Sequence, residues 1–142
     1  MDRSPVDPGA DRPVYRQVAD DLRRRIGEGE LPQGQPLPAE PDLMWQYAVG
    51  RNTLRQALSV LRGEGLIETN RSRAGNVVRK QRPHTPVPVA AGTEVTARMP
   101  TEAERREHDI PEGVPVMVLT STDGTKQVLP ADRFMVVAGD DV

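Results

Sequence analysis

The chain has 142 residues, 36% of them hydrophobic, and it contains no cysteine. That length suits one moderate domain or two small ones, and the lack of thiols excludes disulfides and thiolate metal sites. No apolar run approaches the roughly 20 residues that cross a membrane, and the N-terminal stretch lacks the apolar segment of a signal peptide. These features predict a cytoplasmic protein without membrane contact.

The charge is small overall but unevenly placed. The net charge is −2, yet residues 51–82 hold 8 basic and 2 acidic side chains, whereas residues 87–142 hold 5 basic and 10 acidic ones. A local positive field matters more to a polyanion than the total charge does. Charge alone leaves two readings open, a nucleic-acid surface or a solvated basic face with no partner.

The first predicted segments are a tail, a helix and a turn-rich connection. Residues 1–12, rich in Pro, Gly and Asp, predict a disordered tail. A first helix is expected from Pro13 to about Glu28, because Pro suits the first helical turn. Its apolar stripe recurs every four residues and consists of Val14, Val18, Leu22 and Ile26. The Pro- and Gly-rich segment that follows predicts a turn-rich connection.

A short second helix is expected from residues 39–40 to Tyr47, with Pro41 in its first turn. Its buried face should hold Leu43, Met44 and Tyr47, and Trp45 is expected to be partly buried. Val49 and Gly50 would make a tight turn into a third helix.

The third helix is expected from Arg51 to Gly63. Its core side has helical spacing and consists of Leu54, Ala57, Leu58 and Leu61. Its opposite side gathers arginines and amides with no acid before Glu64: Arg51, Asn52, Arg55, Gln56 and Ser59. Strands at residues 66–69 and 77–79, joined by a turn containing Arg71 and Arg73, would follow.

Three helices and a hairpin in this order predict a winged helix-turn-helix, whose third helix lies in the DNA major groove. Arg can donate two hydrogen bonds to guanine, and Asn or Gln can pair with adenine. An acid at this surface would repel phosphates, which accounts for the composition of the third helix. The arginines of the hairpin turn would contact phosphates or the minor groove.

Four segments together resemble the N-terminal domain of the GntR family of bacterial transcriptional regulators, from about residue 13 to residue 78: PVYRQVADDLRRRI, GELPQGQPLPAE, VGRNTLRQALSVLRGEGLI and RAGNVV. The resemblance, with the helix geometry above, gives the expected DNA-contacting residues: Arg51, Asn52, Thr53, Arg55, Gln56, Ser59, Arg71, Arg73, Gly75 and Asn76. Several positions depart from the family pattern, in the second helix, at the start of the third helix and in the hairpin turn. Ala39 replaces a capping Ser, Pro41 replaces a DNA-contacting Arg, and Gly50 replaces Ser or Thr. We therefore expect an altered or relaxed operator preference.

The second half is predicted to be a Pro-rich linker at residues 80–92 and a small strand-rich domain at 93–139. Strands are expected at 93–99, 114–120, 126–129 and 133–137, and Thr101 with Glu104 forms a capping-box pattern for a helix through His108. The fold class is therefore α+β, a winged helix-turn-helix followed by a small α+β domain.

The segment from TARMPTEAERREHDIPEGVPVMVL to DG resembles the opening of the UTRA domain, the effector-binding half of one GntR subfamily. The segment covers only part of that domain, so the residues that would bind an effector are unknown. A piece this small rarely stabilises itself. It is expected to pair with its copy in a dimer or to pack on the DNA-binding domain.

No catalytic or metal constellation is visible in the sequence. His84 and His108, the two histidines, have no acidic partners at ligand spacing, and no activated nucleophile motif occurs. We therefore expect no cofactor, no metal and no enzymatic activity. The predicted function is a dimeric repressor on a palindromic double-stranded DNA operator, with release by a small-molecule effector. Two alternatives are an effector-independent or partner-controlled switch whose C-terminal domain only dimerises, and an interaction module that has lost specific DNA binding.

Overall fold

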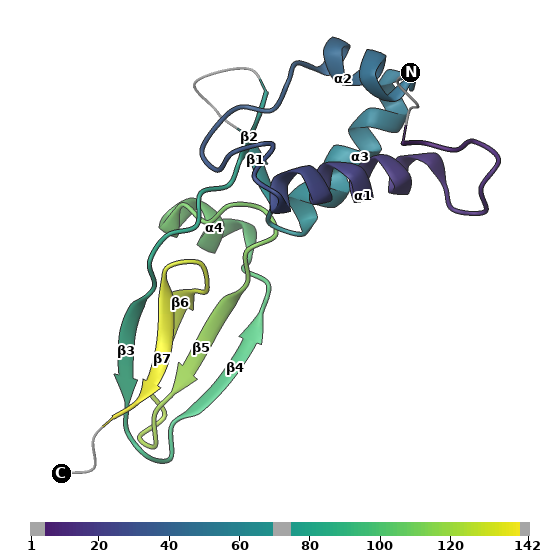
Figure 1. Cartoon of the computed structure of the whole chain (residues 1–142). Coiled ribbons are helices and arrows are strands. Elements are labelled where there is room, and N and C mark those ends of the chain that lie inside the picture. The colour runs from purple at the N-terminus through teal and green to yellow at the C-terminus, as the bar shows by residue number, and fades with distance from the viewer. Residues whose placement is uncertain (1–4, 70–74, 140–142) are drawn as a thin grey trace. The chain divides into compact units, whose positions relative to one another are not determined.

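A computed structural model of the chain describes residues 5–69 and 75–139 (Figure 1). It divides into an N-terminal unit, Met1–Lys80, and a C-terminal unit, Gln81–Val142. The N-terminal unit contains α1 (Val14–Gly27), α2 (Glu40–Tyr47), α3 (Arg51–Gly63), β1 (Ile67–Thr69) and β2 (Asn76–Val78). The C-terminal unit contains β3 (Thr85–Val89), β4 (Glu94–Arg98), α4 (Glu102–His108), β5 (Val116–Thr120), β6 (Lys126–Pro130) and β7 (Phe134–Ala138). None of the described helices combines the length and the apolar composition that a membrane span requires.

The three N-terminal helices enclose an apolar core, as their sequence periodicity predicts. Val18 and Leu22 of α1 are fully buried, and the whole predicted core face of α3 is at most 2% exposed. The partial burial expected of Trp45 is wrong, because its side chain is 83% exposed. Trp45 lies two residues from both Leu43 and Tyr47, which places it about 200° around the helix from the two side chains that α2 buries.

Tyr47 fixes α2 to α1 through its hydroxyl group. Its side chain is 2% exposed, and the hydroxyl donates to Asp21 Oδ2 at 2.6 Å. Arg25 Nη1 donates to the same hydroxyl oxygen at 3.1 Å. Burial, together with the bond to Asp21, raises the pKa of Tyr47 to about 12, so the phenol stays protonated and keeps its role as a donor.

The antiparallel hairpin of β1 and β2 pairs Ile67 with Val78. The connection before α2 lies along the other edge of β2, which sequence periodicity does not predict. There Gly34 N–H donates to Val78 O at 2.8 Å, and Leu37 N–H donates to Asn76 O at 2.9 Å. The turn-rich segment thus places Leu37 in the core and fixes β2 beside α2 and α3.

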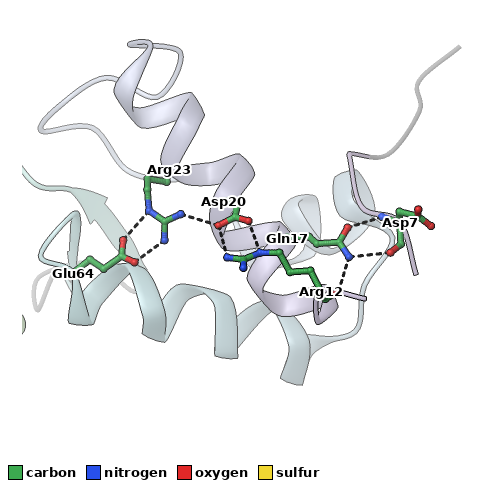
Figure 2. A network of polar contacts seen from close by, with 6 residues as sticks. All are labelled: Asp7, Arg12, Gln17, Asp20, Arg23 and Glu64. Atoms are coloured by element: carbon green, nitrogen blue, oxygen red, sulfur yellow. Dashed lines mark hydrogen bonds and ion pairs between the residues drawn. The ribbon is translucent and has the colours of Figure 1, made fainter. Parts of the chain in front are cut away.

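Residues 5–12, expected to belong to a disordered tail, instead contact α1 (Figure 2). Gln17 bonds the backbone of Asp7 in both directions, with distances of 2.7 Å and 2.9 Å. Arg12 pairs with Asp20 at 2.7 Å. The hydrogen bond from Arg12, with a further one from Arg23, holds the pKa of Asp20 below its ordinary value. Local polar partners therefore order a segment that composition alone assigns to disorder.

The same network continues to the end of α3 (Figure 2). Arg23 donates to Asp20 at 2.9 Å and to Glu64 at 2.6 Å. Both carboxylates raise the pKa of Arg23 above its ordinary value, that of Glu64 most. A bidentate pair joins α1 to the residue that follows α3, so the helix that presents the polar face is held at both its buried side and its C-terminus.

The C-terminal unit consists of two small sheets and α4. The sheet β4-β5-β6 is antiparallel, and β3 pairs with β7 in parallel. The predicted linker at 80–92 is therefore wrong over Thr85–Val89, which forms β3. Alternating prolines keep this segment extended, and the intervening Val87 and Val89 are half-buried, so the segment can act as a strand.

The capping box that begins α4 is confirmed. Thr101 Oγ1 accepts from Glu104 N–H at 3.2 Å, and Glu104 Oε1 accepts from Thr101 N–H at 2.9 Å. Beyond the helix, Arg133 donates to the carbonyl oxygens of His108 and Asp109, which ties the turn between β6 and β7 to the end of α4.

Candidate nucleic-acid interface

The polar face of α3 is open to solvent, as the sequence predicts. Thr53 is half-buried, and the remaining predicted residues on this helix are exposed: Arg51, Asn52, Arg55, Gln56 and Ser59. The buried residues of α3 occupy the opposite side of the helix and anchor it to the core. The helix can therefore offer its amides and guanidinium groups to a ligand without disturbing its own packing.

Gly50 is the N-cap residue of α3, and it provides no side-chain cap. Ala39 likewise leaves the start of α2 without a side-chain cap. Both observations match the losses expected from the departures at these positions. Pro41 lies in the first turn of α2, where its ring cannot replace the charge of an arginine.

Arg55 is paired with Glu40, a contact that the sequence did not reveal. Arg55 Nε lies 3.2 Å from Glu40 Oε1, and the two side chains are 60% and 34% exposed. Exposed pairs of this kind contribute about 0–1 kcal/mol, so a phosphate or a guanine edge can compete for the guanidinium. The available signal was the acid at the first position of α2, 15 residues before Arg55.

Of the four DNA contacts predicted in the hairpin of β1 and β2 and its turn, two lie outside the described residues and two lie within them. Arg71 and Arg73 lie within residues 70–74, outside the described residues. Gly75 is exposed with a φ of 132°, a conformation that favours glycine. Asn76 already has a partner, because its Oδ1 accepts from Arg62 Nη1 at 3.0 Å. The contact joins β2 to α3 and engages the side chain of a residue that was expected to contact DNA.

A groove of about 490 Å³ separates the start of α2, α3 and β2. Its walls include apolar side chains such as Leu37, Leu43 and Val77, and the paired Glu40 and Arg55 also line it. The groove is therefore lined by α3 on one side and by the described part of the hairpin on another. In a winged helix-turn-helix, such a helix enters the major groove of DNA.

Comparisons with known proteins place the N-terminal helices and hairpin among bacterial regulatory proteins. The profile described as "Bacterial regulatory proteins, gntR family" matches residues 14–78. The Glc operon transcriptional activator of Escherichia coli is 44% identical over 71 residues, which are 50% of this chain and 28% of that protein. The mannosyl-D-glycerate transport/metabolism system repressor of the same organism is 39% identical over 71 residues, which are 50% of this chain and 29% of that protein. The matched segment thus spans less than a third of each of these relatives.

Among solved structures, YtrA from Sulfolobus acidocaldarius, a GntR-family transcription factor, is 30% identical with a TM-score of 0.50. The likeness covers 54% of this chain and 80% of that one. The profile match and the helix-helix-helix-hairpin order coincide on the same residues. Residues 14–78 therefore form a winged helix-turn-helix domain of the gntR family of bacterial regulatory proteins.

Proposed function

We propose that the chain is a DNA-binding transcription regulator that acts as a dimer on a palindromic operator. The observation that carries this proposal is the exposed face of α3, which holds Arg51 and Arg55 and no acidic residue. A twofold dimer would present two such helices to two half-sites, which is why we expect a palindromic operator.

The proposed direction of regulation is repression. The mannosyl-D-glycerate system repressor and the Bacillus subtilis repressor NagR, which is 44% identical over 55 residues, support it, whereas the Glc operon relative is named as an activator. A bound regulator blocks or assists polymerase according to where its site lies. The position of the operator relative to the promoter therefore decides between repression and activation. A footprint overlapping the promoter supports repression, and one lying upstream of it contradicts repression.

Fluorescence anisotropy tests the DNA-binding part directly. The purified chain is titrated against its own upstream DNA at two salt concentrations, with scrambled DNA as competitor. We expect binding that survives the competitor, with two protomers per site. Arg55→Ala should cost about 1–3 kcal/mol and reduce the preference for the operator. Arg106→Ala, which removes an exposed arginine from α4 in the other unit, is the matched control and should bind as the unchanged chain does.

Equal binding to both DNAs, or an Arg55→Ala variant that binds unchanged, would overturn the assignment of α3 as the reading helix. The interaction-module alternative would then account better for the fold.

A second candidate keeps the DNA-binding role but removes the small-molecule effector. The apolar cluster of the C-terminal unit is small, with Ile110, Val114 and Val116 buried and Val128 packed against them. A core of this size favours a dimerising element over a sensor with an enclosed pocket. A metabolite screen by thermal melting separates the two, since a sensor is stabilised by its effector and a pure dimerising element responds to none.

A further inference from the structure

Strand β4 is one edge strand of the three-stranded sheet, and β6 is the other (Figure 1). All five of its residues are exposed. Val95 is 46% exposed, and Met99, directly after the strand, is 57% exposed. An uncovered edge strand presents unpaired backbone N–H and C=O groups, which makes it a template for a further strand.

The strand at the other lateral edge in Figure 1, β3, is protected against such pairing. It contains Pro86 and Pro88, which lack N–H donors and are both exposed. Prolines are among the devices that keep sheet edges from adding strands. Strand β4 contains no proline. Strand β6, the other edge of the same sheet, ends in the buried Leu129 and Pro130, so β4 is the more accessible edge for another strand.

The sequence of β4, EVTAR, is complementary to itself. Antiparallel pairing with a second copy, centred on Thr96, sets Glu94 opposite Arg98 of that copy and repeats the contact by symmetry. Val95 then faces Ala97 of the second copy. Opposite charges directly across strands stabilise pairing, whereas like charges oppose it. Edge strands are often protected by charges of a single sign, which repel a second copy. Glu94 and Arg98 have opposite signs, so in the symmetric pairing each faces the opposite charge.

Both charges are available for this contact. Within residues 5–69 and 75–139, Glu94 forms no ion pair. Arg98 donates through Nη1 and Nη2 to Glu104, at 2.7 Å and 2.9 Å, and its side chain is 45% exposed. Its Nε–H has no acceptor among the described residues. The pair with Glu104 fixes the guanidinium in place while leaving one donor for a carboxylate of a second copy.

We propose that β4 is the docking edge for a second copy of this chain, which joins two three-stranded sheets into one sheet across a twofold axis. The contact is isologous, because the same residues serve both copies. This proposal assigns the interface of the dimer described under the proposed function. The role of that dimer in DNA binding rests on the proposed function. Such pairing continues the sheet and places Ala97 of the second copy beside the exposed Val95.

A charge-swap experiment on the full chain tests this pairing by sedimentation equilibrium. Glu94→Arg places two arginine pairs across the interface, and Arg98→Glu places two glutamate pairs there. We expect either variant alone to raise the dimer dissociation constant at least about tenfold. An equimolar mixture should recover the dimer, because each variant supplies the charge that the other lacks. Glu107→Arg changes the net charge equally from an exposed position on α4 and should dimerise normally.

Two results would overturn the proposal: both variants dimerise as tightly as the unchanged chain, or the mixture fails to recover while each variant stays folded. Arg98→Glu also removes the pair with Glu104, so circular dichroism checks its fold. If Arg98→Glu is unfolded, the comparison of the dimer dissociation constants of Glu94→Arg and Glu107→Arg decides the question alone. Operator anisotropy separates this proposal from the DNA-binding one. A monomeric Glu94→Arg chain that still prefers operator half-sites supports both, and a dimer indifferent to DNA sequence supports the interface alone.

Discussion

Arg55 has two competing partners, the carboxylate of Glu40 and the DNA that α3 is proposed to contact. In the free protein the carboxylate holds the guanidinium at 3.2 Å on the exposed side of α3. The contact limits the rotamers of a long side chain, which reduces the entropy lost when the same group binds a base. It also places a negative charge near the phosphates. Glu40 should therefore lower affinity for all DNA while improving the orientation of Arg55.

Glu40→Gln separates these two effects. We expect tighter binding to all sequences, a salt slope steeper by about one because one more cation is free to displace counterions, and a smaller ratio between operator and scrambled DNA. Anisotropy titrations at several salt concentrations measure all three quantities. Asp42→Asn, which neutralises an exposed acid on the same helix, is the matched control. If both variants change the operator preference equally, Glu40 acts only through its charge.

Individual residues show where sequence reasoning succeeds. The positions of Leu54, Leu58 and Arg55 around α3 follow from helical periodicity, which is local, and the structure confirms them. The pairs between Arg55 and Glu40, and between Arg62 and Asn76, join different elements. No spacing rule within one element can predict them, because they depend on how the elements pack.

The helix α2 begins without a side-chain cap, since Ala39 has no hydrogen-bonding group. The backbone of Ala39, with a φ of −59° and a ψ of 150°, already has a conformation that suits an N-cap residue. Pro41 lacks an N–H, so a hydroxyl at position 39 would accept from Asp42 N–H. We expect Ala39→Ser to stabilise the N-terminal unit by about 1 kcal/mol, or roughly 4–8 °C in Tm.

Thermal melting followed by circular dichroism measures this gain. Ala39→Val adds a side chain without a hydroxyl and should give no such increase. A rise in both variants would mean that filling space, rather than capping, stabilises the start of α2.

The capping box of α4 predicts a response to acid. The hydrogen bond from Arg98, followed by that from the backbone of Thr101, lowers the pKa of Glu104 from 4.5 to about 2. The folded pKa lies below the unfolded one, so the stability from this group is present above about pH 4.5 and is lost as pH falls towards 2. Glu104→Gln keeps a hydrogen-bonding side chain but removes this titration.

We therefore expect Glu104→Gln to be less stable than the unchanged chain at pH 7 and equally stable near pH 2. Unfolding midpoints in denaturant across this range measure the difference. Glu107→Gln, at an exposed position on the same helix, should match the unchanged chain throughout. A gap between Glu104→Gln and the unchanged chain that persists at pH 2 would contradict the assigned cause.

At the level of elements, helices were predicted well because capping patterns and apolar spacing lie within a few residues of one another. Strand β3 was missed because Thr-Pro-Val-Pro-Val reads as a linker by composition. Its partner β7 lies about 50 residues later, and the parallel pairing appears in no local pattern. The edge contact of residues 34–37 with β2 was missed for the same reason.

The two units have very different cores. Among the described residues, the apolar cluster of the N-terminal unit contains 13 buried ones, drawn from its three helices, its hairpin and the connection between α1 and α2. In the described part of the C-terminal unit the cluster contains Ile110, Val114 and Val116, with Val128 packed against it, and Leu119 and Leu129 are buried outside that cluster. Because the stability of a small domain follows the apolar area it buries, the first unit should fold alone and the second should depend on association.

Separate fragments test this difference. We expect residues 1–80 to melt at a temperature that does not depend on protein concentration, because the core of this unit is complete in one chain. Residues 81–142 should melt at a temperature that rises with concentration, since a partner that binds only the folded form stabilises it by mass action. Glu94→Arg in the second fragment should remove that rise and lower the melting temperature, and Glu107→Arg should leave both unchanged. A second fragment that melts sharply at one temperature across a hundredfold range of concentration would show that its small core suffices, and the case for a folding role of the β4 edge would fail.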